Sequence, residues 1–184
     1  MNKIVAVVGL CGSGKSEVCR VFEDAAYTKV YFGSITLEEV KRRGLEINEQ
    51  NEKAVREEIR KTHGMAAYAI LNLPKIEAGL KQGNVLIDGL YSWSEYVELR
   101  NEYGDRLKVI AVFAPKKLRY ARLAQRKIRP LTREDVDKRD KAEIENIEKG
   151  GPIAAANYTI INDRGMEDLR KQAEKIKKEI EKEK

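Results

Sequence analysis

The sequence predicts an α/β fold in which helices cover both faces of a five-stranded parallel sheet. Short apolar runs rich in Val and Ile alternate with longer segments of helical pattern, as in strands joined by helical crossovers. The first run is apolar after its first residue and rich in Val, as expected of a buried strand. A glycine-rich loop joins the first run to a helical segment. The 184 residues, 42% hydrophobic and 36% charged, suffice for one domain (residues 1–184) with a substantial core.

The first expected strand, residues 3–8, leads directly into the glycine-rich loop, and residues 17–22 begin a helix. The loop consists of Gly9, Leu10, Cys11, Gly12, Ser13, Gly14, Lys15 and Ser16. It fits the P-loop pattern G-x-x-x-x-G-K-[ST], with the strand before it and the helix after it that the pattern requires. A turn that merely joins strand to helix is the plainer alternative, and this context disfavours it.

The loop chemistry indicates binding of a nucleoside triphosphate. Glycines let the backbone curl so that its amides surround phosphate oxygens, and the helix N-terminus adds partial positive charge. Lys15 is expected to reach the β- and γ-phosphates, and the Ser16 hydroxyl to bind Mg²⁺. The predicted cofactors are therefore ATP and magnesium.

The remaining strands are expected at residues 28–32, 84–88, 107–113 and 158–162. Helices are expected at 48–62, 65–81, 94–103 and 133–148, from Pro115 onward and from Met166 onward. Thr36 and Glu39 have the spacing of a capping box, and Pro74 should kink its helix or divide it. Residues 34–81 and 115–155 are too long for simple crossovers. Each begins at the carboxyl end of a strand, which predicts a substrate-binding arm and a lid.

Asp88 ends the third expected strand, so it should face the same crevice as the glycine-rich loop. A carboxylate there is expected to hold Mg²⁺ directly or through water. The alternative is that Asp88 only starts a turn with Gly89.

The chain's net charge of +6 is concentrated in one stretch, because residues 116–141 hold eleven lysines and arginines against four acids. Arg119, Arg122 and Arg126 fall on one helical face, and residues 128–132 interrupt the helix as a flap. Guanidinium groups suit triphosphate oxygens. We favour a phosphate clamp over RNA binding, because the stretch has few aromatic residues for stacking on bases.

The sequence has no apolar run long enough to span a membrane and no signal-peptide layout, which indicates a cytoplasmic protein. Cys11 and Cys19 lie in the same strand–loop–helix unit, so a disulfide scaffold is not expected.

With these residues placed, the chain resembles the P-loop nucleotide and nucleoside kinases nearly end to end. It is most similar to the group of dephospho-CoA kinase and the poorly characterised archaeal and bacterial kinase-like proteins placed with it. The resemblance rests on residues 9–16, Gly33, residues 60–64 and 87–89, Arg122-Leu123 with Arg126, and residues 132–140, 151–154 and 158–162. It implies a three-layer P-loop NTPase fold.

The resemblance also implies roles for single residues. Arg122 and Arg126 would be lid arginines over the transferred phosphoryl group and the adenine. Asn162 to Gly165 would lie against the base, and Arg60 would reach the acceptor. Tyr91 and Trp93 would stack on an acceptor ring or, equally, cover the sheet edge.

Ser34 departs from the family pattern, because dephospho-CoA kinases commonly carry an Asp there that takes a proton from a hydroxyl acceptor. Its loss favours a phosphate acceptor, which needs little proton removal, although Glu38 or Glu39 could substitute as the base.

These features predict a kinase that transfers phosphate from ATP to a small nucleotide or nucleotide-like acceptor, similar to nucleoside monophosphate kinases. The alternatives are dephospho-CoA kinase and, in another class, a nucleotide-dependent regulatory or RNA-associated ATPase. The sequence leaves the acceptor, the base preference and the oligomeric state open.

Overall fold

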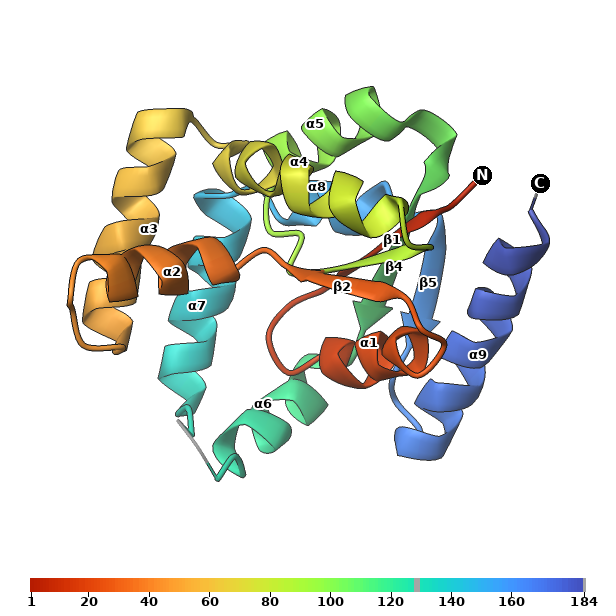
Figure 1. Cartoon of the computed structure of the whole chain (residues 1–184). Coiled ribbons are helices and arrows are strands. Elements are labelled where there is room, and N and C mark those ends of the chain that lie inside the picture. The colour runs from red at the N-terminus through yellow and green to blue at the C-terminus, as the bar shows by residue number, and fades with distance from the viewer. Residues whose placement is uncertain (128–129, 184) are drawn as a thin grey trace.

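The computed structural model describes residues 1–127 and 130–183, which form a five-stranded sheet in the order β2-β3-β1-β4-β5 (Figure 1). All four ladders are parallel. The strands are β1 (Ile4–Val8), β2 (Thr28–Tyr31), β3 (Val85–Asp88), β4 (Leu107–Phe113) and β5 (Tyr158–Ile161). The predicted α/β fold with a five-stranded parallel sheet is therefore confirmed.

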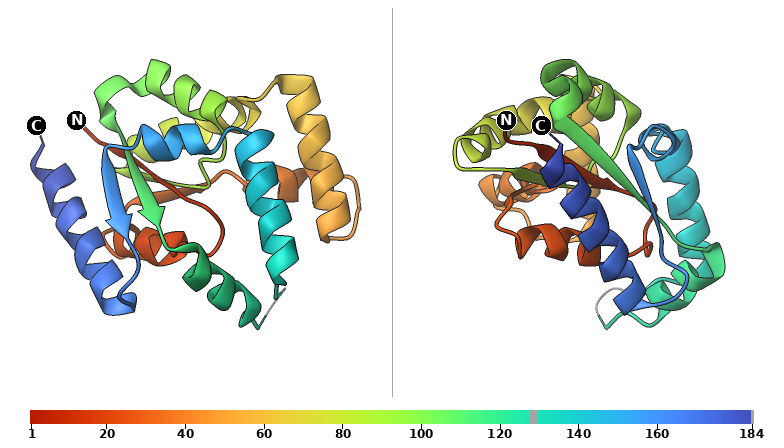
Figure 2. Two further views of the ribbon diagram at one scale, coloured as in Figure 1. Left: turned by 180° about the vertical axis from the view of Figure 1, so that it is seen from behind. Right: turned by 90° about the vertical axis from the view of Figure 1, so that its right-hand side faces the viewer.

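Helices form a layer on each face of the sheet (Figure 2). On one face lie α1 (Lys15–Glu23) and α9 (Met166–Lys182), which pack on alternate strand residues such as Val5 and Val7. On the other lie α4 (Ala67–Leu80), α5 (Trp93–Tyr103) and α8 (Gly150–Ala154), against the intervening residues such as Ala6. The period of two along each strand thus divides the apolar side chains between two cores.

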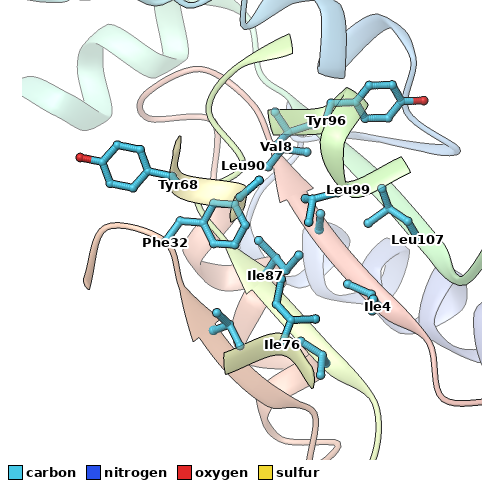
Figure 3. Packing of buried hydrophobic residues seen from close by; sticks show 14 of the residues in the cluster. Ile4, Val8, Phe32, Tyr68, Ile76, Ile87, Leu90, Tyr96, Leu99 and Leu107 are labelled. Atoms are coloured by element: carbon cyan, nitrogen blue, oxygen red, sulfur yellow. The ribbon is translucent and has the colours of Figure 1, made fainter. Parts of the chain in front are cut away.

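The core on the face of α4 and α5 is the larger one. Ile4, Phe32 and Ile87 are fully buried there, and Figure 3 shows their side chains packed between the strands and the covering helices. Burying one such side chain stabilises the fold by roughly 1.5–3 kcal/mol. The sheet is therefore a rigid frame for the loops at its carboxyl end.

Two groups of helices follow the carboxyl ends of β2 and β4. After β2 come α2 (Ser34–Arg42) and α3 (Glu49–His63), within the predicted arm. After β4 come α6 (Lys116–Ala124) and α7 (Arg133–Glu145), within the predicted lid. A short 3₁₀ helix (Gly104–Arg106) precedes β4. Ile128 and Arg129, in the predicted flap, lie outside the described residues.

The capping box predicted at Thr36 is wrong. α2 already begins at Ser34, and the Thr36 hydroxyl is buried 2.5 Å from the Tyr68 hydroxyl, so tertiary contact decides its environment. Capping boxes instead start α5, at Ser92 with Glu95, and α7, at Thr132 with Asp135. Both appose a polar side chain to otherwise unpaired amides of the first helical turn.

Two expected helices differ from the structure in length. α4 is one helix from Ala67 to Leu80 with Pro74 inside it, so the proline does not divide it into two helices. The helix expected at 133–148 ends at Glu145 with Asn146 as its cap, and Glu148 then adopts a left-handed conformation with a φ of 52° before α8. Among the described helices, none is long and apolar enough to cross a membrane.

Candidate active site

The glycine-rich loop leaves the central strand β1 and enters α1, and its glycines are required by geometry. Gly9 has a φ of 153°, and a Cβ there would lie 2.4 Å from the carbonyl oxygen of Val112. Gly14, the cap of α1, has a φ of 108°, and its Cβ would lie 2.4 Å from Nδ2 of Asn162. A side chain at either position would meet both a disfavoured φ and a clash. The first amides of α1 stay free of helical partners at this loop.

Lys15 folds back over the loop that precedes it. Its Nζ donates to the carbonyl oxygens of Gly9 at 2.9 Å and Leu10 at 3.0 Å. Burial lowers the pKa of Lys15 to about 8, and the positive charge of Lys149 contributes to the decrease. Phosphate oxygens bind an ammonium group more strongly than neutral carbonyls do. The contact of Lys15 with the β- and γ-phosphates stays a prediction.

Asp88 is the last residue of β3, which lies next to β1, and it pairs in register with Val7 of β1. Its Oδ2 lies 2.9 Å from Nζ of Lys29, which also donates to Glu23 at 2.9 Å. Burial opposes the charge on Lys29, but the hydrogen bonds with Asp88 and Glu23 outweigh it and raise the pKa of that lysine. Asp88 is thus paired with Lys29 at the carboxyl edge of the sheet.

The donor set near the loop fits magnesium held jointly with a polyphosphate. Ser16 is exposed, and its hydroxyl and the Asp88 carboxylate are the oxygen ligands that Mg²⁺ prefers. The described residues contain no cluster of three or more His, Cys, Asp or Glu side chains able to form a complete protein cage. A magnesium ion here would take its remaining ligands from phosphate and water.

Arg119 attaches the lid helices to the outside of the loop. Its Nη1 donates to the Cys11 carbonyl at 3.0 Å and to Asp140 Oδ1 at 3.0 Å, and its Nη2 donates to Asp140 Oδ2 at 2.6 Å. Both side chains are buried, and Cys11 packs nearby against Leu123 and Val136. Arg119 is therefore engaged in a structural ion pair between α6, α7 and the loop, and it is not presented with Arg122 and Arg126 as one clamp.

Arg122 also lies against the loop, through Asn162. It donates to Asn162 Oδ1 at 3.1 Å and lies 3.5 Å from the Gly12 carbonyl oxygen, and Asn162 Nδ2 donates to the Ser13 carbonyl at 2.8 Å. Asn162 is buried under the loop, where its side chain positions the backbone. Arg126 is exposed, and Gly165 caps α9 with a φ of 126°. The contacts predicted for these residues with the phosphoryl group and the base stay predictions.

Comparison with known proteins places the chain in a family. A family model described as an AAA domain matches residues 8–148. The UPF0200 protein TK1334 of Thermococcus kodakarensis is 35% identical over 181 residues, which cover 96% of this chain and 97% of that protein. The chain belongs to the UPF0200 family of AAA-domain proteins.

Solved structures of kinases share the fold of this UPF0200 protein. Shikimate kinase from Acinetobacter baumannii in complex with shikimate superposes with a TM-score of 0.58 at 19% identity, covering 100% of this chain and 97% of that one. Dephospho-CoA kinase from Campylobacter jejuni superposes with a TM-score of 0.53 at 17% identity, covering 97% of each chain. The predicted resemblance to P-loop kinases, with their three-layer fold, is confirmed at the level of fold.

The predicted acceptor residues Ser34 and Arg60 come from the arm. Ser34 begins α2, and its hydroxyl accepts from Lys75 Nζ at 3.0 Å, while that amine also bonds Glu38 at 2.6 Å. The guanidinium of Arg60 lies 5.2 Å from the centre of the Tyr68 ring, a cation–π contact. Its Nε is buried without a hydrogen-bond partner in the described part of the chain.

The predicted acceptor residues Tyr91 and Trp93 follow β3, and other side chains of the fold contact both rings. Tyr91 packs edge-on to Tyr68 at 6.5 Å, and Trp93 stacks on Tyr96 at 5.1 Å with an angle of 25° between the rings. A Cβ on Gly151 would come within 2.5 Å of the Trp93 ring, so α8 closely approaches it. Binding of an acceptor by these rings stays a prediction.

The sequence analysis missed the charged groups that the end of the lid brings to the loop. Lys149 is buried beside Glu143, and the pKa of Lys15 responds to the charges of both. A lysine before Gly150 and Gly151 has the sequence signature of an ordinary helix end, which gives no reason to expect a site residue. Only the fold shows that this lysine is buried beside Glu143 and that its charge acts on Lys15 of the glycine-rich loop.

Proposed function

We propose that the chain is an ATP- and Mg²⁺-dependent phosphotransferase that acts on a small nucleotide or nucleotide-like acceptor. The observation that carries this proposal is the placement of Lys15 and Asp88, one in a glycine-rich loop after β1 and the other at the end of the neighbouring strand β3. Magnesium bound by Ser16 and Asp88 would neutralise charge on the phosphates.

In the proposed reaction the chain contributes position and charge. Loop amides and Lys15 hold the polyphosphate in place, and Lys15 stabilises negative charge that develops during transfer. Arg122, held at the loop by Asn162, adds a guanidinium on the lid side. The lid helices reduce the access of water, which would otherwise compete with the acceptor.

The environment of Ser34 favours an acceptor that needs no strong base. Glu38 bonds Lys75 at 2.6 Å, and that hydrogen bond lowers the pKa of Glu38. Hydrogen bonds from Arg42, and to a smaller extent from Arg43, lower the pKa of Glu39 to about 2. Carboxylates held so firmly in the ionised state are weak bases. A nucleoside monophosphate, whose phosphate oxygen is already anionic, is the acceptor class that this arrangement supports.

A screen of acceptors tests the proposal. ADP release would be measured with Mg-ATP and each nucleoside monophosphate, with dephospho-CoA and shikimate as hydroxyl acceptors. We expect turnover with a nucleoside monophosphate. Turnover with dephospho-CoA alone would support the second candidate, dephospho-CoA kinase, whose Campylobacter jejuni representative shares the fold.

Variants of two lysines give the matched control for this screen. Lys15→Ala is expected to abolish turnover without unfolding the chain, because its amine bonds only loop carbonyls among the described residues. Lys53→Ala, which removes an exposed arm lysine, should leave turnover unchanged. Equal turnover in Lys15→Ala and wild type, or no calorimetric heat with Mg-ATP, would overturn the proposal.

Binding of RNA by the basic lid is the less favoured activity, because acids of α7 neutralise much of the lid's positive charge. The paired residues are Lys116, Arg119, Lys138, Arg139 and Lys141. Binding of RNA that weakens steeply with salt, without acceptor-dependent ATP turnover, would favour this alternative.

A further inference from the structure

A second buried ammonium group lies beside the phosphate loop. Lys149 follows α7 as the cap of α8, and its side chain is 3% exposed. Its Nζ bonds Glu143 Oε2 at 2.8 Å, and Glu143 Oε1 accepts from Arg139 Nε at 3.2 Å. The lid therefore ends in a compact network of two cations and one carboxylate.

One contact and one electrostatic effect place this network near the loop. Nζ of Lys149 lies 5.2 Å from the centre of the Tyr91 ring, three residues after Asp88. The positive charge of Lys149 also lowers the pKa of Lys15, after the larger effect of burial. Lys149 thus contacts the chain that follows the predicted metal ligand and lies near enough to Lys15 for its charge to act on the loop.

The backbone fixes the position of Lys149. Glu148 has a φ of 52°, a conformation that a residue with a side chain adopts only at a cost. The Lys149 amide donates to the Glu143 carbonyl at 3.0 Å, and the Ile147 carbonyl accepts from the Trp93 amide at 3.2 Å. The strained turn is held from both α7 and α5, so the lysine is directed inward by several contacts.

The charges around the loop do not balance. Lys149 and Arg139 share the single carboxylate of Glu143, which leaves one positive charge in excess in this network. Lys15 adds a further positive charge, and Asp88, another carboxylate that acts on Lys15, is already paired with Lys29. Withdrawing charges from water is costly unless an opposite charge compensates. The excess of positive charge calls for an anion, and the loop amides select phosphate.

We propose that Lys149 binds the γ-phosphate of ATP, exchanging its bond with Glu143 for phosphate oxygens. This inference rests on the proposed function and deepens it, because it adds Lys149 to Arg122 as a second cation of the lid that contacts the phosphates. Of the two lid arginines, Arg122 is held by Asn162 and Arg126 is exposed, whereas Lys149 is buried.

Calorimetry with two nucleotides tests the assignment. The affinities for Mg-ADP and for the magnesium complex of β,γ-imido-ATP, which is not hydrolysed, would be measured for wild type and Lys149→Met. We expect the imido-ATP affinity to fall by about ten- to a hundredfold, the effect of losing a charge-assisted hydrogen bond, and the ADP affinity to change by less than about twofold.

Two further variants keep the result interpretable. Lys141→Met removes an exposed lysine of α7 and should change neither affinity. Lys149→Met leaves Glu143 buried with one fewer partner, so Glu143→Gln/Lys149→Met provides a version without the orphaned charge. The double variant should show the same selective loss.

The outcomes separate this inference from the proposed function. An unchanged ratio of imido-ATP to ADP affinity in both Lys149 variants, or an equal loss for both nucleotides, would refute the γ-phosphate contact while leaving a nucleotide-binding protein. A wild-type chain that binds neither nucleotide would refute the proposed function, and this inference with it.

Discussion

Replacing Asp140 by alanine should destabilise the protein far more than an ordinary surface substitution. The Asp140 side chain is 11% exposed and that of its partner Arg119 is 6% exposed. Without the carboxylate, the guanidinium would keep the Cys11 carbonyl as its acceptor while remaining buried. Removing one partner of such a pair costs about 3–5 kcal/mol. For a chain of this size, we expect the melting temperature to fall by about 6–20 °C.

Urea unfolding of three variants measures this effect. Glu134→Ala is the control on the same helix, because Glu134 bonds Lys138 at 2.7 Å but is 76% exposed, and we expect a loss below about 1 kcal/mol. Arg119→Met/Asp140→Leu replaces the pair by apolar side chains and should regain most of the stability lost in Asp140→Ala. If Asp140→Ala cost no more than Glu134→Ala, the claim that this pair holds the lid against the loop would be refuted.

Three other perturbations test separate parts of the structure. Burial raises the pKa of Glu95 to about 7 against backbone hydrogen bonds that lower it, so the folded state binds more protons than the unfolded state between pH 4.5 and 7. The free energy of unfolding should therefore fall by up to about 3 kcal/mol as the pH rises through this window. Urea titrations at several pH values would measure it, and Glu95→Gln should make it depend less on pH. Lys29→Met removes the amine that lies 2.9 Å from Asp88, so magnesium chloride alone should raise the melting temperature of this variant more than that of the wild type. An equal rise in the two proteins would contradict the predicted metal role of Asp88. Asn162→Ala leaves the Ser13 carbonyl without its 2.8 Å donor, so the free energy of unfolding should fall by about 1–3 kcal/mol. ATP binding measured by calorimetry should also weaken. Unchanged values for both would show that the contact is dispensable.

The fold could be predicted because its determinants are local in sequence. The strand expected at residues 107–113 is found as Leu107–Phe113, and the one expected at 28–32 as Thr28–Tyr31. Short apolar runs of this kind have few alternatives once a parallel sheet is required. The glycine-rich loop is equally local, since its eight residues are contiguous and each of its glycines has a positive φ that disfavours other residues.

The lid chemistry could not be predicted, because it depends on contacts between separate helices. Arg119 and Asp140 each resemble solvated residues of a charged helix, and their pairing across 21 positions requires the angle between α6 and α7. Likewise, Thr36 has the spacing of a capping residue but finds the Tyr68 hydroxyl 32 positions away. Sequence spacing describes one helix at a time, and these interactions join two.

The same long-range contacts explain why the phosphate loop can be ready before a ligand arrives. Three successive carbonyls on its outer side, those of Cys11, Gly12 and Ser13, face Arg119, Arg122 and Asn162 respectively. A trans peptide points its N–H opposite to its C=O, so holding the Cys11 and Ser13 carbonyls outward turns the amides of Gly12 and Gly14 to the inner side of the loop, while the Ser13 amide donates to the Leu10 carbonyl at 3.2 Å. Donors fixed in this way need no reorganisation when charge develops on a phosphate, which is the condition for strong electrostatic stabilisation. The lid and β5 therefore act on the site through the backbone of the loop, even where their side chains never touch the ligand.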